Sequence, residues 1–225
     1  MDHRKIAAAS RPAPSAAISR RLFATAGLAS VGLLWGRRAL AQPALDPTAE
    51  SPMGPFYPVD RPAESDLDLT RLAGHDERAR GTIIEVSGRV LDRHGHPVNG
   101  ARLELWQCNA AGRYAHAADV STAPLDPNFQ GYAELRTDAS GAWRIITVKP
   151  GGYDSPIGHR PPHLHWDLRG SRYRTVAQMY FPEDEAANAV DRLYRELGEA
   201  ARTSVAVRDP RDPAKYRWDI VLMEG

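Results

Sequence analysis

The histidine pair His163 and His165 is the part of this 225-residue sequence best suited to bind a metal ion. Imidazole is the commonest metal-binding side chain in proteins, and residues two apart on a β-strand point to the same face. Leu164, Trp166 and Leu168 fall on the opposite face, where a core could hold the strand rigid. Because such histidine pairs also occur on solvated strand faces, the pair alone does not identify a metal site.

Two tyrosines on predicted loops near this strand add a second type of ligand. Tyr114 lies in a long irregular stretch, residues 110–128, and Tyr153 follows a strand-breaking turn at residues 149–152. Loops of that length in a compact domain are usually functional or disordered, and the aromatic and aliphatic content here favours order. A phenol has a pKa of about 10, so its anion binds at neutral pH only to a strongly Lewis-acidic ion such as ferric iron. Because the chain has no haem motif, these residues suggest a mononuclear non-haem ferric site.

The first 41 residues are predicted to be an export signal that is not part of the fold. Residues 19–23 (SRRLF) form a twin-arginine signature, and an apolar run at residues 22–35 follows. Residues 39–41 (ALA) give the pattern of a cleavage site, and the apolar run is short for a membrane span. We therefore expect a bacterial protein in the periplasm or secreted medium, with no stable membrane association after cleavage. An uncleaved tether is the alternative.

The charge balance changes when this signal is removed. Residues 1–41 carry seven of the 29 Lys and Arg residues and one of the 28 acidic residues, which leaves 22 basic and 27 acidic residues. A net charge of about −5 argues against nucleic acid or an anionic membrane as a partner. The single cysteine, Cys108, excludes an intrachain disulfide and a multi-cysteine metal site, and we expect it to be a buried small hydrophobe.

Residues 42–80 are predicted to form an extended N-terminal arm held onto the domain. They are rich in proline and acidic residues and show no sustained hydrophobic period. A stiff aromatic turn at residues 54–58 (GPFYP) stands out within the arm. Tyr57 in this turn is a candidate wall of a nearby pocket, and a purely packing role is the alternative.

Alternating apolar and polar residues predict several β-strands after the arm. Residues 82–90 and 101–108 are predicted to be partner strands joined by a turn. Residues 131–137 and 141–148 are predicted to form a second hairpin.

The rest of the chain is predicted to contain further strands and one helix. Strands are expected at residues 175–181 and 216–223, after the strand that carries the two histidines. Residues 183–201 show an apolar stripe at helical spacing. Many short strands and a single helix predict that residues 81–225 form a mostly β catalytic domain. Its fold is expected to be an antiparallel β-sandwich with long functional loops and one helix in the C-terminal half.

Several segments of the chain resemble the intradiol ring-cleavage dioxygenases, in particular the protocatechuate 3,4-dioxygenase side of that family. The segments are residues 106–114 (WQCNAAGRY), 125–129 (LDPNF), 149–153 (KPGGY) and 160–165 (RPPHLH). They occur in order and at family-like spacing, and the turn at residues 54–58 also resembles the N-terminal arm of the family. All positions that match the family's metal ligands are filled.

The resemblance implies a ferric iron with four protein ligands and a water or hydroxide in the fifth position. These ligands are Tyr114, Tyr153, His163 and His165. Tyr153 matches the axial tyrosine that leaves the metal when substrate arrives in the family, and Tyr114 matches the one that stays. His163 matches the axial histidine and His165 the equatorial one.

The same resemblance implies roles for residues around the metal. Arg160 matches an arginine that stabilises negative charge on the activated ring, and Gln178 matches a polar residue near it. Trp106 matches a residue that lines the substrate pocket, and we expect Tyr57 to contribute there as well. Together with Tyr153, Arg160 and Gln178 are the candidate catalytic residues.

The implied reaction is cleavage of a catechol-type ring by O2 between its two hydroxylated carbons, giving a cis,cis-muconate-type diacid. The partners are then an ortho-diphenol and O2, with protocatechuate, catechol and other lignin-derived diphenols all open as substrates. This chain is one short subunit, whereas typical protocatechuate enzymes pair two related subunits, so a homo-oligomer is compatible with the sequence.

Two alternatives remain at this point. One is a secreted β-sandwich binding module with a vestigial metal site, against which the intact ligand positions and Arg160 argue. The other is a different metal, such as zinc or copper, for which two phenolate ligands are a poor match.

Overall fold

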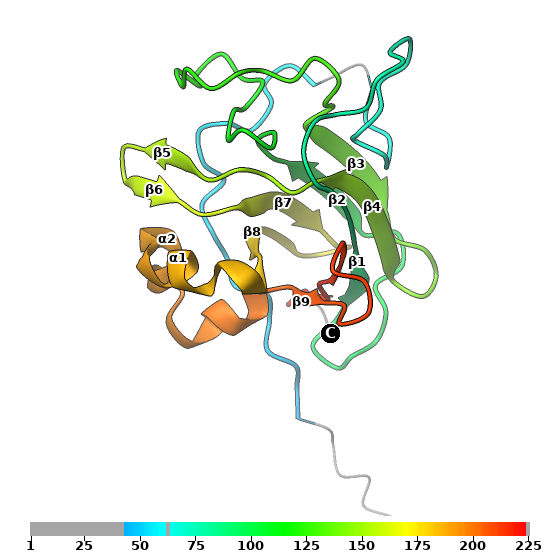
Figure 1. Cartoon of the computed structure of the whole chain (residues 1–225). Coiled ribbons are helices and arrows are strands. Elements are labelled where there is room, and N and C mark those ends of the chain that lie inside the picture. The colour runs from blue at the N-terminus through cyan, green and yellow to red at the C-terminus, as the bar shows by residue number, and fades with distance from the viewer. Residues whose placement is uncertain (1–42, 62–63, 224–225) are drawn as a thin grey trace, which may run out of the picture. The chain divides into compact units, whose positions relative to one another are not determined.

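The computed structural model describes residues 43–61 and 64–223, which form two β-sheets with a short hairpin and a group of short helices beside them (Figure 1). The five-stranded sheet contains β1 (Ile83–Leu91), β4 (Ala142–Val148), β9 (Val207–Arg208), β10 (Lys215–Arg217) and β11 (Ile220–Val221). The four-stranded sheet has the order β3 (Tyr132–Arg136), β2 (Arg102–Trp106), β7 (His163–Arg169) and β8 (Arg174–Tyr180). β5 (Tyr153–Ser155) and β6 (Gly158–Arg160) form the hairpin. The predicted export signal, residues 1–41, lies outside the described residues.

The main core lies between the two sheets. Leu164, Trp166 and Leu168 of β7 are all fully buried there, together with Ile84 and Val86 of β1. Burial of each such side chain stabilises the fold by about 1.5–3 kcal/mol. The alternation along β7 thus anchors one face of this strand in the core and turns the other face, with both histidines, the opposite way.

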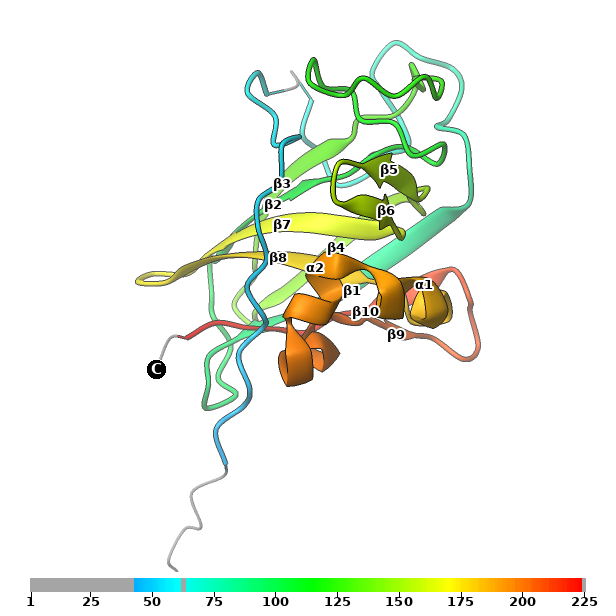
Figure 2. The ribbon, with the colours of Figure 1, turned by 90° about the vertical axis from the view of Figure 1, so that its left-hand side faces the viewer.

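The outer face of the four-stranded sheet is also buried, because the N-terminal arm crosses it. The arm appears in blue in Figure 2, running across the strands of this sheet. The backbone N–H of Ser51 donates to the carbonyl of Val176 in β8 at 2.8 Å. Tyr57 packs against the buried Trp106, and Phe56 stacks on the buried Tyr114. Every residue of β7 from His163 to Leu168 is therefore buried.

A further part of the arm pairs with the five-stranded sheet. The backbone N–H of Ile146 in β4 donates to the carbonyl of Leu67 at 2.7 Å, and the N–H of Leu69 donates to the carbonyl of Ile146 at 2.9 Å. Ser65 reaches the edge of the other sheet, where its carbonyl accepts from the N–H of Glu134 in β3 at 3.3 Å.

Strand register places the candidate site residues in rows across the outer face. Trp106 of β2 lies opposite His165 of β7, and His165 lies opposite Gln178 of β8. His163 lies opposite Tyr180 in the next row. Residues distant in the sequence are thus fixed beside the histidine pair by backbone hydrogen bonds.

The β-sandwich class is confirmed, but both predicted strand pairings are wrong. β1 pairs with β4, and β2 pairs with β3 and β7, so the predicted partners 82–90 and 101–108 lie in different sheets. The predicted hairpin of residues 131–137 and 141–148 likewise connects the two sheets. Alternation predicts which face of a strand is buried but does not identify its neighbour. β1 also pairs in parallel with β10 and β11, so the five-stranded sheet is mixed.

The predicted helix over residues 183–201 is interrupted. It consists of α1 (Glu185–Val190) and α2 (Arg192–Glu196), flanked by the 3-10 segments η1 (Pro182–Asp184) and η2 (Gly198–Ser204). Asp191 has an extended conformation, and its side chain accepts a hydrogen bond from the N–H of Tyr194, which starts α2. The expected apolar stripe does not face the core, since Val190 is 74% exposed. The predicted last strand is also divided, into β10 and β11. No helix among the described residues is long and apolar enough to cross a membrane.

Candidate active site

The predicted metal ligands converge on one point beside β7. The Nε2 atoms of His163 and His165 are 3.1 Å apart, and the hydroxyl of Tyr153 lies 3.4 Å from Nε2 of His163. The Tyr114 ring lies 5.4 Å from that of Tyr153 and 6.2 Å from that of His165, between ring centroids. The histidines come from a strand and Tyr114 from a loop, as the sequence predicts. Tyr153, which was also expected on a loop, is instead the first residue of β5.

Both imidazoles are held neutral by their surroundings. Burial, and secondarily the positive charge of Arg160, lower the pKa of His163 to about 3. Burial also lowers the pKa of His165 well below its ordinary value, with His163 and Arg160 adding to the effect. Nδ1 of His163 donates to the Pro161 carbonyl at 2.7 Å, so its Nε2 carries the free lone pair. Because a metal ligand must be deprotonated, these histidines are ready to bind a cation at neutral pH.

The tyrosines differ in their access to solvent. Tyr114 is only 3% exposed, and its hydroxyl has no hydrogen-bond partner among the described residues. Tyr153 is half-buried and lines an open cleft. Burial raises the pKa of both phenols above 10, so both are protonated unless a strong Lewis acid replaces the proton.

This donor set fits ferric iron. An orphaned buried hydroxyl at Tyr114, two neutral imidazoles and a second phenol are the hard and borderline donors that such an ion accepts. Across the described residues no group of three or more His, Cys, Asp or Glu side chains gathers elsewhere to hold a metal. These tyrosines and histidines would therefore hold the iron.

Close packing of two glycine-containing loops brings Tyr114 and Tyr153 together. Gly112 has a φ of +79°, and a Cβ built on it would lie 2.3 Å from the carbonyl oxygen of Gly152. The carbonyl of Asn109 accepts from the N–H groups of both Gly112 and Gly151 at 3.0 Å. The two motifs that end in tyrosine thus pack backbone against backbone.

Arg160 lies beside the ligands in a buried hydrogen-bond network. Its Nε donates to Asp191 at 2.8 Å, and its Nη2 donates to Gln178 at 2.6 Å and to the Tyr180 hydroxyl at 3.1 Å. The Tyr180 hydroxyl in turn donates to Asp191 at 2.9 Å. Gln178 also donates to the carbonyl of Pro52 in the arm at 3.1 Å. The guanidinium is therefore fixed in position and its charge is balanced by a carboxylate.

Asp191 is the residue of this network that sequence reasoning missed. The continuous helix predicted over residues 183–201 placed Asp191 inside a regular helix and gave it no separate role. The available signal was its side-chain type, since aspartate is a preferred residue at the start of a helix. The interruption of the helix brings the Asp191 carboxylate to Arg160.

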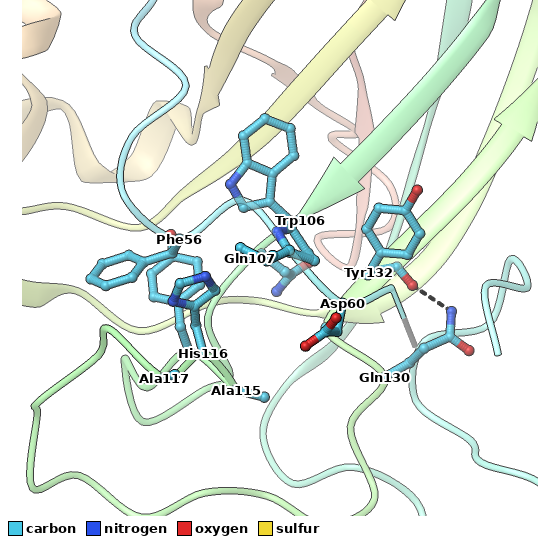
Figure 3. A pocket seen from close by; sticks show the side chains of 13 residues that line it. Phe56, Asp60, Trp106, Gln107, Ala115, His116, Ala117, Gln130 and Tyr132 are labelled. Atoms are coloured by element: carbon cyan, nitrogen blue, oxygen red, sulfur yellow. Dashed lines mark hydrogen bonds between the residues drawn. The ribbon is translucent and has the colours of Figure 1, made fainter. Parts of the chain in front are cut away.

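Two hollows flank the ligand set. A cleft of about 910 Å³ is lined by Tyr153 and Arg160, and a smaller hollow of about 380 Å³ is lined by Tyr114. Figure 3 shows the smaller one, with Phe56 and His116 toward one end and Gln130 toward the other.

The two predicted substrate-binding residues do not line the larger cleft. Trp106 stacks on His165 with ring centroids 5.0 Å apart and lines the smaller hollow. Tyr57 packs edge-on against Trp106, and its hydroxyl donates to Glu104 at 2.5 Å. Both therefore support the histidine strand from the arm side, and their contact with substrate stays a prediction.

Comparisons with known proteins agree with this geometry. A family model described as "Dioxygenase" matches residues 53–224. The chain is 42% identical over 179 residues to the protocatechuate 3,4-dioxygenase beta chain of Burkholderia cepacia, covering 75% of this chain and 76% of that protein. It is 31% identical over 205 residues to hydroxyquinol 1,2-dioxygenase of Corynebacterium glutamicum, covering 79% of this chain and 64% of that protein.

A solved structure shares the fold. The dioxygenase domain of a dioxygenase carbohydrate-binding protein fusion from Streptomyces sp. SirexAA-E superposes with a TM-score of 0.61 at 25% identity, over 80% of this chain and 100% of that chain. Fold and site together define a β-sandwich protein with a buried centre of histidines and tyrosines. With the family match and the relatives named above, the chain belongs to the intradiol ring-cleavage dioxygenase family, and the predicted family is confirmed.

Replacing Gly112 by alanine should separate the two tyrosine loops. Gly74 is the matched control, because it also has a positive φ, of +79°, but a Cβ added there would meet no atom within 4 Å. We expect Gly74→Ala to cost about 1 kcal/mol of stability, because alanine is strained at a positive φ. Gly112→Ala should cost at least about 2 kcal/mol, because its Cβ also clashes with the Gly152 carbonyl. Denaturant unfolding of both variants measures this difference. Equal losses would show that the Gly112–Gly152 contact does not constrain the loops.

Proposed function

We propose that this protein is a ferric-iron-dependent intradiol dioxygenase that cleaves ortho-diphenols with O2. The observation that carries the proposal is the convergence of two neutral, buried imidazoles and two phenols beside an open cleft. The family to which the chain belongs supports the same class of reaction.

The reaction balances without an external reductant. The bond between the two hydroxyl-bearing carbons of the ring breaks, and one atom of O2 is added to each of these carbons. Both carbons become carboxyl groups, so the product is an unsaturated diacid that contains all the atoms of the diphenol and of O2. Ferric iron, when bound, would supply a Lewis acid and template for the two diphenol oxygens.

Tyr153 is the ligand best placed to exchange protons with an entering diphenol. It lines the larger cleft, whereas Tyr114 is only 3% exposed and lines the smaller hollow. A phenolate at Tyr153 would accept a proton from one diphenol hydroxyl at its own oxygen. The raised pKa of this phenol favours retention of that proton.

Arg160 would stabilise negative charge on the ring. It lines the cleft beside Tyr153, and its network with Asp191 and Gln178 prevents the side chain from turning away. A fixed cation in a site with little water stabilises developing charge more strongly than a mobile one, because it requires no reorganisation during the reaction.

Tyr114→Phe should lower iron affinity by about tenfold or more, since it removes a ligand and leaves the ring packing intact. Tyr216→Phe is the matched control, because Tyr216 is a buried phenol in the core between the sheets. Iron content and the visible absorption of the purified protein, before and after anaerobic catechol, measure the effect. Full iron and an unchanged phenolate-to-iron band in Tyr114→Phe would disprove the ligand assignment. A wild-type protein that stays colourless after ferric reconstitution would favour a binding module with a vestigial site.

Arg160→Ala should keep iron but reduce turnover by about 10² or more. The substitution also leaves Asp191 buried without its partner, which costs about 3–5 kcal/mol of stability. The double variant Arg160→Ala, Asp191→Asn removes that charge, so it should recover stability and remain slow. Thermal unfolding and O2 uptake measure the two effects separately. Turnover that returns together with stability would exclude a direct role of Arg160.

We also propose that the protein is exported through the twin-arginine pathway and cleaved after Ala41. The signature at residues 19–23 and the small residues at 39–41 support this. Replacing both Arg20 and Arg21 by lysine should retain the protein in the cytoplasm, as measured by cell fractionation and N-terminal sequencing. Unchanged export of this variant would contradict the proposal.

A further inference from the structure

The cleft beside Tyr153 is larger than a single aromatic ring requires. Its volume of about 910 Å³ lies near the upper end of the range of about 300–1,000 Å³ found for pockets that hold drug-sized ligands. Its walls come from four parts of the chain, namely the arm, the loop on either side of Tyr114, the β5–β6 hairpin and α2. A catechol ring bound at the ligands would fill only the inner end.

Several exposed side chains that line the cleft are apolar. Val120 on the loop is 91% exposed, and Ile157 at the tip of the hairpin is 41% exposed. Leu193 of α2 and Pro55 of the arm also line the cleft. Large apolar side chains held at the surface around a groove are typical of a site that binds an apolar ligand.

The charged residues that line the cleft are already paired with other groups. Arg160 binds Asp191, and Nδ1 of His159 lies 2.8 Å from the carboxylate of Asp154. Asp119 accepts hydrogen bonds from backbone N–H groups, including that of Tyr114 at 2.7 Å.

This arrangement is unfavourable for an anionic substituent. Each basic side chain among the described residues that line the cleft has its own acidic partner, and the carboxylate of Asp119 is balanced by Arg113 at 3.8 Å. A substrate carboxylate would lose its water there without gaining a charged partner. Arg160 is 4% exposed and its guanidinium is already bound to Asp191, Gln178 and Tyr180, so it is not a free cation for a ring substituent.

We propose that the preferred substrates are ortho-diphenols whose ring carries a bulky, uncharged, apolar substituent. This inference rests on the proposed ring-cleaving function and extends it to the substrate class. The substituent lies between Val120 and Ile157, and the diphenol oxygens lie at the ligand set.

The matched pair that tests this is protocatechuate and its methyl ester, because they differ in charge and little in shape. Unsubstituted catechol and tert-butylcatechol complete the set and test size without charge. We expect kcat/KM for the methyl ester to exceed that for protocatechuate by about tenfold or more. We also expect tert-butylcatechol to bind metal-free protein more tightly than catechol does, as measured by titration calorimetry.

Two variants test whether the mouth of the cleft determines the preference for the ester over the acid. Ile157→Lys places a cation at the mouth of the cleft and should reduce the ester-to-acid ratio by about fivefold or more. Val207→Lys is the control, because Val207 is also exposed but lies on β9 of the five-stranded sheet and does not line this cleft. It should leave the ratio unchanged.

The outcomes separate this inference from the function it extends. If the protein cleaves catechol but its kcat/KM for protocatechuate equals or exceeds that for the methyl ester, the inference is overturned and the ring-cleaving function stands. Equal changes of the ester-to-acid ratio in Ile157→Lys and Val207→Lys would show that this cleft does not bind the ring substituent. A protein that binds ferric iron but cleaves none of the four diphenols would overturn both proposals.

Discussion

The structure depends on the burial of both faces of strand β7. One face is anchored in the core between the sheets, and the other is covered by the arm and by aromatic side chains. This second layer removes water from His163 and His165, which keeps both imidazoles uncharged. A cation that enters then meets lone pairs and phenols that have few competing partners. The same burial that makes these side chains costly to charge would make them effective ligands under the proposed function.

The positive charge beside the centre is arranged so that it does not repel a metal strongly. Arg160 lowers the pKa of both histidines, yet its charge is balanced by Asp191 from the break between α1 and α2. A buried pair of this kind gives little net stability, but it fixes the direction of the guanidinium. The helix is interrupted at the residue that supplies this carboxylate.

The sequence allowed prediction of the four side chains that converge beside β7, because their types, order and spacing resemble one family and because alternation places His163 and His165 opposite an apolar face. Their role as metal ligands stays a prediction. It also predicted a β-sandwich and a buried Cys108, which is 1% exposed with its pKa raised to about 12 by burial. Strand partners could not be predicted, since alternation is the same whichever sheet a strand joins. Asp191 could not be predicted either, because its importance arises from a contact with Arg160, which lies 31 residues away in the sequence.

The arm has a consequence for solubility that does not involve the active site. Ser51 pairs with β8, Ser65 with β3 and Leu67 with β4, so one polar, proline-rich segment occupies backbone groups on strands at three sheet edges. Exposed edges of this kind are where separate copies of a β-protein join into aggregates. By occupying them within the chain, the arm limits intermolecular strand pairing.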